Sequence, residues 1–182
     1  MGSRGASTGV TPGHEPLASS PAMLHLRSDS LATTASIAAS LAGLSRRGDL
    51  IVLAGEMGAG KTAFAKGFGE AIGVTEPITS PTYTLVHSYP AGRMTLHHAD
   101  IYRLTTLHEV ADLALSELLE SDGIVMVEWG DVVAGSLGDH VMVRLEFDDA
   151  DAEARGIEIS AAGRAWAARW AEVERRLADF KC

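Results

Sequence analysis

The chain has 182 residues, of which 46% are hydrophobic and 21% are charged, a composition that excludes a fully disordered chain or a coiled-coil rod. No apolar run approaches the roughly 18 residues of a membrane-spanning helix, so we expect no association with a membrane. Fifteen basic and 24 acidic residues give a net charge of −9. A surface this acidic disfavours nucleic-acid binding that depends on phosphate neutralisation.

Several residue types are rare or missing, which limits the chemistry available to the protein. The sequence contains no Asn and no Gln, so a site that needs a side-chain amide is excluded. The three lysines are Lys61, Lys66 and Lys181. The single cysteine, Cys182, has no partner for a disulfide and excludes a cysteine-based zinc site, so we expect a cytoplasmic protein.

The chain is expected to divide into a tail and one domain. Residues 1–22 are mostly Gly, Ser, Pro, Thr and Ala, which predicts a disordered N-terminal tail. This stretch lacks the apolar segment of a secretory signal. Residues 23–182 are numerous enough to bury one hydrophobic core, so we expect them to form a single domain.

The first predicted elements surround a glycine-rich loop. A helix is expected to begin after a cap at Ser28 or Asp29. The continuous apolar run at 50–54 predicts a strand that is buried on both faces. It is followed by a loop at 55–60 and by a helix at 61–72, which is the strand–loop–helix order of a phosphate-binding loop.

The rest of the domain is predicted to contain a hairpin, a helix, further strands and a C-terminal helix. In order, these are strands at 82–89 and 94–98, a helix at 107–119, a strand at 124–127, a strand pair at 141–147 and 156–160, and a final helix. The final helix has one apolar stripe, expected to pack in the core, formed by Trp166, Trp170, Val173, Leu177 and Phe180.

Buried strands that alternate with helices indicate an α/β fold. We expect three layers around a mixed, mainly parallel central sheet, in which the hairpin supplies an antiparallel portion. Together with the glycine-rich loop, this order predicts the fold of a P-loop NTPase.

Residues 55–62 match the phosphate-binding pattern G-x-x-x-x-G-K-[ST]. Glycines let the backbone of such a loop approach phosphate oxygens, and the following helix points its N-terminal amides at them. Lys61 would add a positive charge at the β- and γ-phosphates, and the Thr62 hydroxyl would ligate Mg²⁺. The predicted nucleotide-binding residues of this segment are Gly58, Ala59, Gly60, Lys61, Thr62 and Ala63.

A P-loop also needs an acid at the end of a neighbouring strand to bind Mg²⁺, directly or through water. Glu128 follows the apolar run 124–127, and Asp100 follows the predicted strand 94–98. We assign Glu128 to the metal and Asp100 to metal-bound or attacking water, although the two roles are interchangeable on this argument. Thr82 is a second candidate for positioning the water.

The nucleotide is predicted to be ATP rather than GTP. G proteins read guanine with an [NT]-K-x-D motif, and this chain has no Asn, while its lysines follow Gly60, Ala65 and Phe180. It also has no Gln to orient the attacking water, so a carboxylate or a hydroxyl must do so.

Four segments, in this order and spacing, resemble those of the TsaE (YjeE) family: Gly55–Thr62, Ser80–Val86, His98–Leu104 and Val127–Trp129. The resemblance covers about residues 28–165. Members of this family are small bacterial ATPases of the machinery that makes N6-threonylcarbamoyladenosine (t6A) at position 37 of tRNAs that read ANN codons. The resemblance therefore implies an ATPase of tRNA modification.

The resemblance implies the same catalytic set as the residues themselves. Lys61 would bind phosphate, Thr62 and Glu128 would hold Mg²⁺, and Asp100 would be an acid that hydrolysis needs.

It also implies roles for residues outside this set. Trp129 would pack beside the nucleotide, the segment 80–82 would form a switch-like loop near the γ-phosphate, and Thr34 would lie near the adenine. Many members have Pro after the Glu-Trp pair, whereas this chain has Gly130, so the resemblance does not extend to the shape of that loop, although it still covers the metal ligand Glu128.

By the same resemblance, the partners are the TsaB and TsaD proteins. The chain would hydrolyse ATP to reset this pair between turnovers, and it would contact tRNA only through them. The acidic net charge fits that division of work.

Two other functions remain open on the sequence, a small P-loop kinase and a nucleotide-binding scaffold without useful catalysis. Arg103 fits either a contact to the γ-phosphate or a surface salt bridge. His97, His98 and Asp100 suggest a zinc site, but adjacent strand residues point to opposite faces, so we do not expect one.

Overall fold

The computed structural model describes residues 22–92, 94–104, 106–111, 113–121 and 123–182. The predicted disordered tail lies outside these residues except for Ala22, whose carbonyl accepts a hydrogen bond of 3.2 Å from the Ala161 N–H. Among the described residues, no helix has the length and apolar character needed to cross a membrane.

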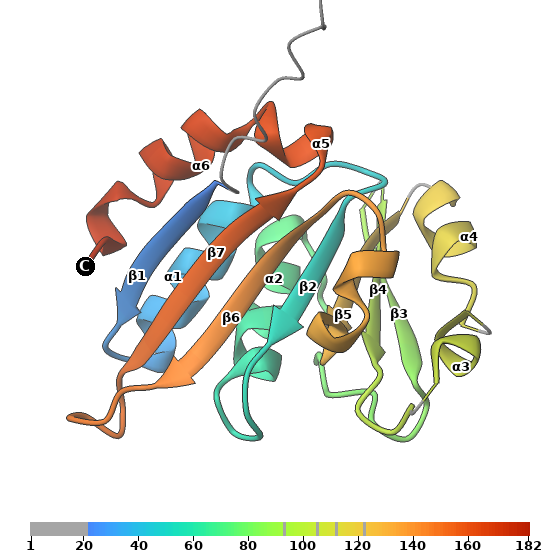
Figure 1. Cartoon of the computed structure of the whole chain (residues 1–182), viewed down its shortest axis with the longest axis horizontal. Coiled ribbons are helices and arrows are strands. Elements are labelled where there is room, and N and C mark those ends of the chain that lie inside the picture. The colour runs from blue at the N-terminus through green and yellow to red at the C-terminus, as the bar shows by residue number, and fades with distance from the viewer. Residues whose placement is uncertain (1–21, 93, 105, 112, 122) are drawn as a thin grey trace, which may run out of the picture.

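A seven-stranded mixed sheet forms the centre of the molecule (Figure 1), with the strand order β1-β7-β6-β2-β5-β4-β3. The pairings β6–β2, β2–β5 and β5–β4 are parallel, and β1–β7, β7–β6 and β4–β3 are antiparallel. All strands except β7 and β3 therefore run in one direction. The strands are β1 Met23–Ser28, β2 Leu50–Ala54, β3 Val86–Ala91, β4 Met94–Asp100, β5 Gly123–Glu128, β6 His140–Phe147 and β7 Arg155–Ala162.

Helices lie on both faces of the sheet. The helices α1 and α2 cover one face (Figure 1). On the other face, α3, α4 and the 3₁₀ turns η1 and η2 lie beside β2, β5 and β4, whereas no helix of the described residues covers that face of β1, β7 and β6. The helices are α1 Leu31–Ala42, α2 Lys61–Ile72, α3 Leu107–Ala111, α4 Leu115–Glu120, α5 Arg164–Ala167 and α6 Trp170–Arg176, and the 3₁₀ turns are η1 Gly130–Val132, η2 Ala134–Ser136 and η3 Ala178–Phe180.

The strand β2 is buried on both faces, as its apolar run predicts. Ile51 and Leu53 face the core beneath α1 and α2, whereas Leu50 and Val52 face the smaller core beneath α3, α4 and η1. By contrast, β1 alternates between exposed and buried residues, because only one of its faces is covered. The domain is thus three layers thick around β2 and two layers thick at the β1 edge.

No element is predicted from the sequence at residues 23–27, yet β1 is a strand there. Every second residue of β1 is buried, namely Leu24, Leu26 and Ser28, which is the alternation expected of a strand. The strand has only six residues and directly follows the Gly-, Ser- and Pro-rich tail, so this short alternation is not recognised in the sequence. The cap of α1 also differs from the prediction, because Ser30 holds it, with its Oγ accepting a hydrogen bond of 3.1 Å from the Thr33 N–H.

The predicted strand at 82–89 begins later than expected. The Leu85 N–H donates to the Pro81 carbonyl at 2.7 Å, and Leu85 has a φ of 63°, so residues 81–85 form a turn. The strand β3 then continues through Pro90 to Ala91, which pairs with Met94. Proline is tolerated here because β3 is an edge strand.

Two predicted helices are interrupted in the structure. The helix expected at 107–119 is divided into α3 and α4 at Ala114, whose φ is 49°. The C-terminal helix is divided into α5, α6 and η3, but its predicted stripe does pack inward, with Trp166, Val173 and Leu177 buried. Interruption lets short helices follow the surface of a twisted sheet while their apolar residues stay buried.

The helices α1 and α2 are in close contact at Gly67. A Cβ atom at Gly67 would lie 2.7 Å from the Cα of Ala35 and 2.9 Å from its Cβ. These contacts are to backbone and to a methyl group, which have no rotamer to relax into. Only glycine therefore fits at this crossing, and it fixes the distance between α1 and the helix that follows the glycine-rich loop.

We predict that Gly67→Ala destabilises the protein by about 1–3 kcal/mol, because the added methyl overpacks the crossing of the two helices. In an open helix the same change would stabilise by about 0.5–1 kcal/mol. Urea unfolding followed by circular dichroism measures the difference. Gly135→Ala is the control, since a methyl group added there would meet no atom within 4 Å beyond its chain neighbours. A raised unfolding midpoint for Gly67→Ala would contradict the prediction.

Candidate functional site

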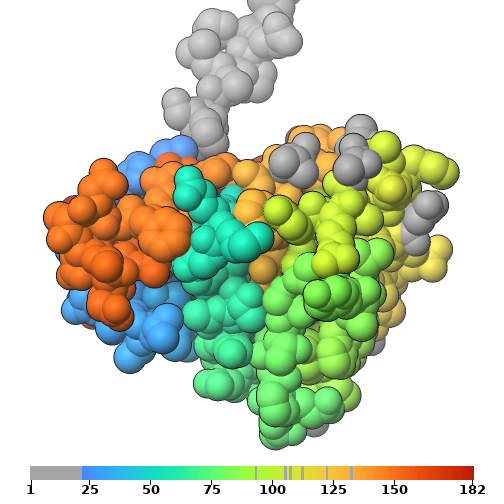
Figure 2. Space-filling model, turned by 90° about the horizontal axis from the view of Figure 1, so that it is seen from below, coloured from blue at the N-terminus to red at the C-terminus, as the bar shows by residue number. Residues whose placement is uncertain are grey.

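The glycine-rich loop joins β2 to α2 at the carboxyl edge of the sheet, as predicted. Figure 2 looks onto this edge and shows the loop in teal between the orange β6–β7 turn and the green segments around residues 80–100. Gly60, the cap of α2, has a φ of 109°, which disfavours any side chain. A Cβ on Gly55 would lie 2.2 Å from the Leu145 carbonyl oxygen. Both glycines are thus needed for the loop to close over the sheet edge.

The ammonium group of Lys61 is held within the protein. Its Nζ donates to the carbonyls of Gly55 at 2.6 Å and Glu56 at 2.8 Å, and it lies 3.8 Å from the centre of the Trp129 ring. Burial lowers the pKa of Lys61, against the opposing effect of nearby carboxylates, of which Glu128 is the strongest. An anionic phosphate would therefore compete with two carbonyl dipoles and an aromatic face for this cation.

Thr62 and Glu128 meet beside the lysine. The Thr62 hydroxyl donates to Glu128 Oε1 at 3.0 Å, and Glu128 is only 3% exposed. The contact exists because β2 and β5 are parallel neighbours, with Leu53 opposite Glu128. A hydroxyl and a carboxylate supply oxygen ligands of the kind that Mg²⁺ prefers, so this pair fits the metal that the phosphate-binding pattern predicts.

Asp100 ends β4, directly opposite Glu128 in the neighbouring strand. Its Oδ2 accepts hydrogen bonds from Ser80 Oγ at 2.9 Å and Thr82 Oγ1 at 2.8 Å, and its Oδ1 accepts one from the Tyr102 N–H at 2.9 Å. Two hydroxyls of residues 80–82 are therefore bound to this one carboxylate at the end of β4. The sequence predicts Thr82 and Asp100 as alternative groups for positioning the attacking water. In the structure the two side chains are hydrogen-bonded to each other.

Trp129 lies over the lysine with an unusual backbone. Its φ is 64°, and its N–H donates to the Leu53 carbonyl at 2.8 Å. The indole also packs on the Tyr102 ring at 4.9 Å. At the next position, a Cβ on Gly130 would lie 3.0 Å from Val52 Cγ1, so the chain enters η1 in close contact with β2.

These residues surround a cavity of about 430 Å³. Among the sequence-predicted site residues, Gly58, Gly60, Lys61, Thr62, Ala63, Asp100, Glu128 and Trp129 line it. It is completed by Met57, Ser80, Thr82, Tyr102 and Arg103. The Arg103 guanidinium lies 4.6 Å from the Tyr83 ring centre, and its two possible roles stay predictions.

Two predicted residues are outside the described lining. Ala59 is fully buried, and its carbonyl accepts a hydrogen bond of 3.1 Å from Arg155 Nε. Thr34 is buried near the start of α1, where its hydroxyl is 2.8 Å from Ser28 Oγ, and its role near an adenine stays a prediction. Arg155 was not predicted from the sequence, because no local pattern links a residue of β7 to a loop 96 residues earlier.

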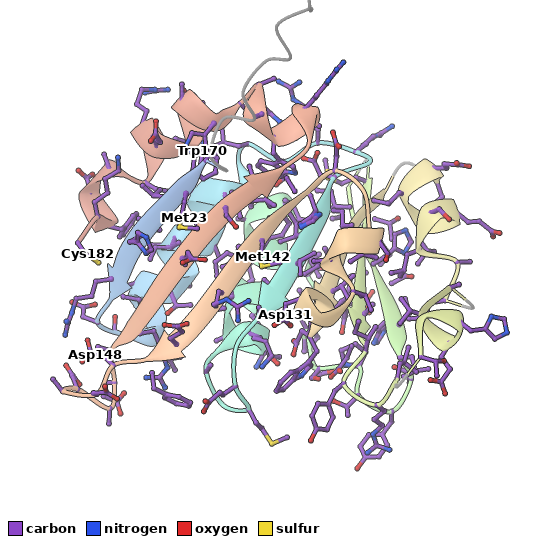
Figure 3. All side chains as sticks on the ribbon, in the orientation of Figure 1. Met23, Asp131, Met142, Asp148, Trp170 and Cys182 are labelled. Atoms are coloured by element: carbon purple, nitrogen blue, oxygen red, sulfur yellow. The ribbon has the colours of Figure 1, made fainter. Side chains whose placement is uncertain are left out.

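A second cavity, of about 740 Å³, lies on the other side of Trp129. The carboxylates of Glu56, Asp131, Glu146 and Asp149 line it, and the Arg144 guanidinium is 3.5 Å from Asp131. Figure 3 shows Asp131 close to the lower end of β2. Four acids against one arginine disfavour phosphate here, so the smaller cavity with Lys61 is the better phosphate site.

The histidines of β4 do not form a metal cluster with Asp100. His97 Nδ1 is 2.8 Å from Ser88 Oγ, whereas His98 Nε2 is 3.0 Å from Glu128 Oε1. Within the described ranges, no group of three or more His, Cys, Asp or Glu side chains is arranged to hold a metal ion. A metal in this site would take its remaining ligands from phosphate and water, as Mg²⁺ usually does.

We predict that Asp100→Ala loosens the turn at 80–82, because two of the hydroxyl contacts of this turn end on that carboxylate. Hydrogen exchange followed by mass spectrometry should show faster amide exchange in peptides that span residues 79–85. Asp131→Ala is the control, since Asp131 pairs with Arg144 in the other cavity. Equal exchange in this segment for the wild type and Asp100→Ala would show that other contacts hold the turn.

Comparison with known proteins connects this geometry to a family. The family profile described as "Threonylcarbamoyl adenosine biosynthesis protein TsaE" matches residues 28–157. A tRNA threonylcarbamoyladenosine biosynthesis protein TsaE of Streptomyces coelicolor is 40% identical over 134 residues, which span 70% of this chain and 89% of that protein. The TsaE protein of Treponema pallidum is 41% identical over 99 residues, which span 54% of this chain and 73% of that protein.

A relative from Bacillus subtilis, also named TsaE, is 39% identical over 104 residues, covering 57% of this chain and 65% of that protein. Among solved structures, the crystal structure of Bacillus subtilis YdiB superposes with a TM-score of 0.73 at 27% identity, covering 87% of this chain and 98% of YdiB. The fold is therefore that of an α/β P-loop NTPase. Since the profile spans more than half of the chain and includes the predicted site, the chain belongs to the TsaE family of threonylcarbamoyl adenosine biosynthesis proteins.

Proposed function

We propose that this chain is a Mg²⁺-dependent ATPase that binds the TsaB–TsaD pair and supports threonylcarbamoyl modification of tRNA adenosine 37 in the cytoplasm, with tRNA contacted only through its partners. The observation that carries the proposal is the convergence of Lys61, Thr62, Asp100 and Glu128 on one cavity at the end of the glycine-rich loop. These four side chains supply a cation, a hydroxyl and two carboxylates, which are the groups that phosphoryl transfer to water requires.

Phosphate binding would begin with the loop backbone. The amides of residues 60–63, at the N-terminus of α2, bind phosphate oxygens, because the unpaired N–H groups of a first helical turn and the helix dipole both favour an anion there. Lys61 exchanges its bonds to the Gly55 and Glu56 carbonyls for phosphate oxygens. Thr62 and Glu128 would hold Mg²⁺, which would supply charge neutralisation at the phosphates.

The attacking water would be held by Asp100 and Thr82, which line the same cavity. In the structure the Thr82 hydroxyl donates to Asp100, and both residues line the cavity, so the two groups are held next to each other there. Asp100 accepts a hydrogen bond from the water and can take its proton, either directly or through the hydroxyl. This assignment supplies the water-positioning group that a chain without Gln needs.

Exposed apolar side chains at the same edge support a protein partner. Met57 is 69% exposed and Tyr83 is 86% exposed, and Tyr102 and Phe147 are also among the large hydrophobic residues open to solvent. Met57 and Tyr102 line the cavity, and Tyr83 directly follows the lining residue Thr82. Phe147 ends β6 beside the glycine-rich loop. Solvated aromatic residues around a binding site are typical of a surface that a partner covers.

The main alternative is a small P-loop kinase, which needs an acceptor pocket and arginines that close over the phosphates. Arg103 is the one arginine among the described residues that line the smaller cavity. The neighbouring cavity is acidic and offers little to a phosphorylated acceptor. These features favour water as the phosphoryl acceptor.

The proposal predicts ATP hydrolysis that depends on the lysine and the buried acid. Lys61→Ala and Glu128→Gln should each lower kcat at least about 100-fold in the presence of purified TsaB and TsaD, because each removes charge stabilisation of the transition state. Phosphate release measures the rate. Lys66→Ala, an exposed lysine on the same helix, is the matched control and should retain the activity.

Each alternative has its own result in this assay. ATP binding without hydrolysis above background, with TsaB and TsaD present, would favour a scaffold. Transfer of labelled phosphate to nucleosides or small metabolites would favour a kinase. Failure of the chain to associate with TsaB and TsaD in the presence of ATP would remove the proposed partners.

A further inference from the structure

His98 is a buried polar residue that has no part in the predicted site or in the proposed mechanism. It lies in β4, two residues before Asp100, and its side chain is completely buried. Its Nε2 lies 3.0 Å from Glu128 Oε1 in the parallel neighbour β5. A buried imidazole in contact with a buried carboxylate must be hydrogen-bonded with good geometry, since either group alone would be costly to bury.

The two hydrogen-bond donors that reach Glu128 converge on one of its oxygens. Thr62 Oγ1 and His98 Nε2 both lie 3.0 Å from Oε1. Within the described part of the chain, Oε2 is thus the oxygen left for a metal ion or a metal-bound water. Two donors on one oxygen also fix the rotation of the carboxylate about its last side-chain bond.

The surroundings of the ring assign the position of its proton. A carboxylate accepts only, so Nε2 must carry the hydrogen that it donates to Glu128. The other nitrogen, Nδ1, is buried and has no hydrogen-bond partner among the described residues. A hydrogen on Nδ1 would be a buried donor without an acceptor. The geometry therefore places the ring hydrogen on Nε2.

We propose that His98 is a positioning residue, which holds Glu128 through an Nε2–H hydrogen bond so that Oε2 faces the Mg²⁺ of the nucleotide complex. The inference rests on the proposed function, since it gives Glu128 its metal. Residues that hydrogen-bond to a metal ligand orient it, and their loss typically weakens metal affinity by about 10- to 100-fold. His98 contacts neither the nucleotide nor the metal and acts only through Glu128.

The test compares two amide variants that place a donor at different positions. In His98→Gln the side-chain nitrogen reaches the position of Nε2, whereas in His98→Asn it reaches the position of Nδ1. The affinity of the ADP-bound full chain for Mg²⁺ is measured by calorimetry. Affinity within about threefold of the wild type is expected for His98→Gln, and a roughly 10- to 100-fold loss for His98→Asn.

His97→Gln is the matched control, because the adjacent histidine contacts Ser88 rather than Glu128 and its replacement should leave Mg²⁺ affinity unchanged. ADP affinity without Mg²⁺ should be the same in all variants, which separates positioning from a loss of folding. Equal Mg²⁺ affinity for the wild type and a folded His98→Asn would overturn the inference. A wild type that binds ADP without any dependence on Mg²⁺ would overturn the inference and the metal part of the proposed function together.

A measurement on the wild type avoids any variant that does not fold. Two-bond nitrogen–proton NMR correlations distinguish the tautomers of histidine, and the inference requires His98 to carry its proton on Nε2. Glu128→Gln should shift this proton signal, because it replaces the charged acceptor. A proton on Nδ1 alone would overturn the inference, since Nε2 would then have no hydrogen to donate.

Discussion

The parallel pairing of β5 with β2 on one side and β4 on the other is the constraint on which the site depends. This register places Glu128 beside Leu53 and opposite Asp100, so the two acids end their strands at the same level as the start of the glycine-rich loop. Side chains alternate between faces along a strand, and a slip of one residue would turn Glu128 away from Thr62. The two hydrophobic cores oppose such a slip, because it would exchange the residues of β5 that face each of them.

A second feature of the site is that its charged groups are hydrogen-bonded within the protein before a ligand binds. Lys61 is held by loop carbonyls, Glu128 by Thr62 and His98, and Asp100 by Ser80 and Thr82. Nucleotide binding therefore exchanges contacts instead of filling a set of free charges. The glycine-rich loop and residues 80–82 both border this cavity, so a ligand bound there would contact both.

The secondary structure could be predicted where the pattern was long or distinctive and not where tertiary contacts decided it. The apolar run of β2 and the glycine pattern before α2 identify their elements directly. Three of the differences between the predicted and observed elements show what tertiary contacts decide. β1 is a strand because it pairs with β7, which lies far later in the chain. The turn at 81–85 depends on contacts with Asp100, and the break at Ala114 lets α3 and α4 each bury apolar residues against the sheet.

The sequence by itself determined the phosphate loop, the buried strand before it and the identities of the two strand-end acids, because these depend on short segments whose chemistry is local. The tertiary structure alone decided which groups meet: the convergence of Thr62 and His98 on one oxygen of Glu128, and the support of the loop by Arg155 from β7. The absence of Asn and Gln from the chain limits which side chains can form this site. A chain without Asn or Gln must build its site from hydroxyls, carboxylates, one lysine and a buried histidine, and only strand pairing brings these together.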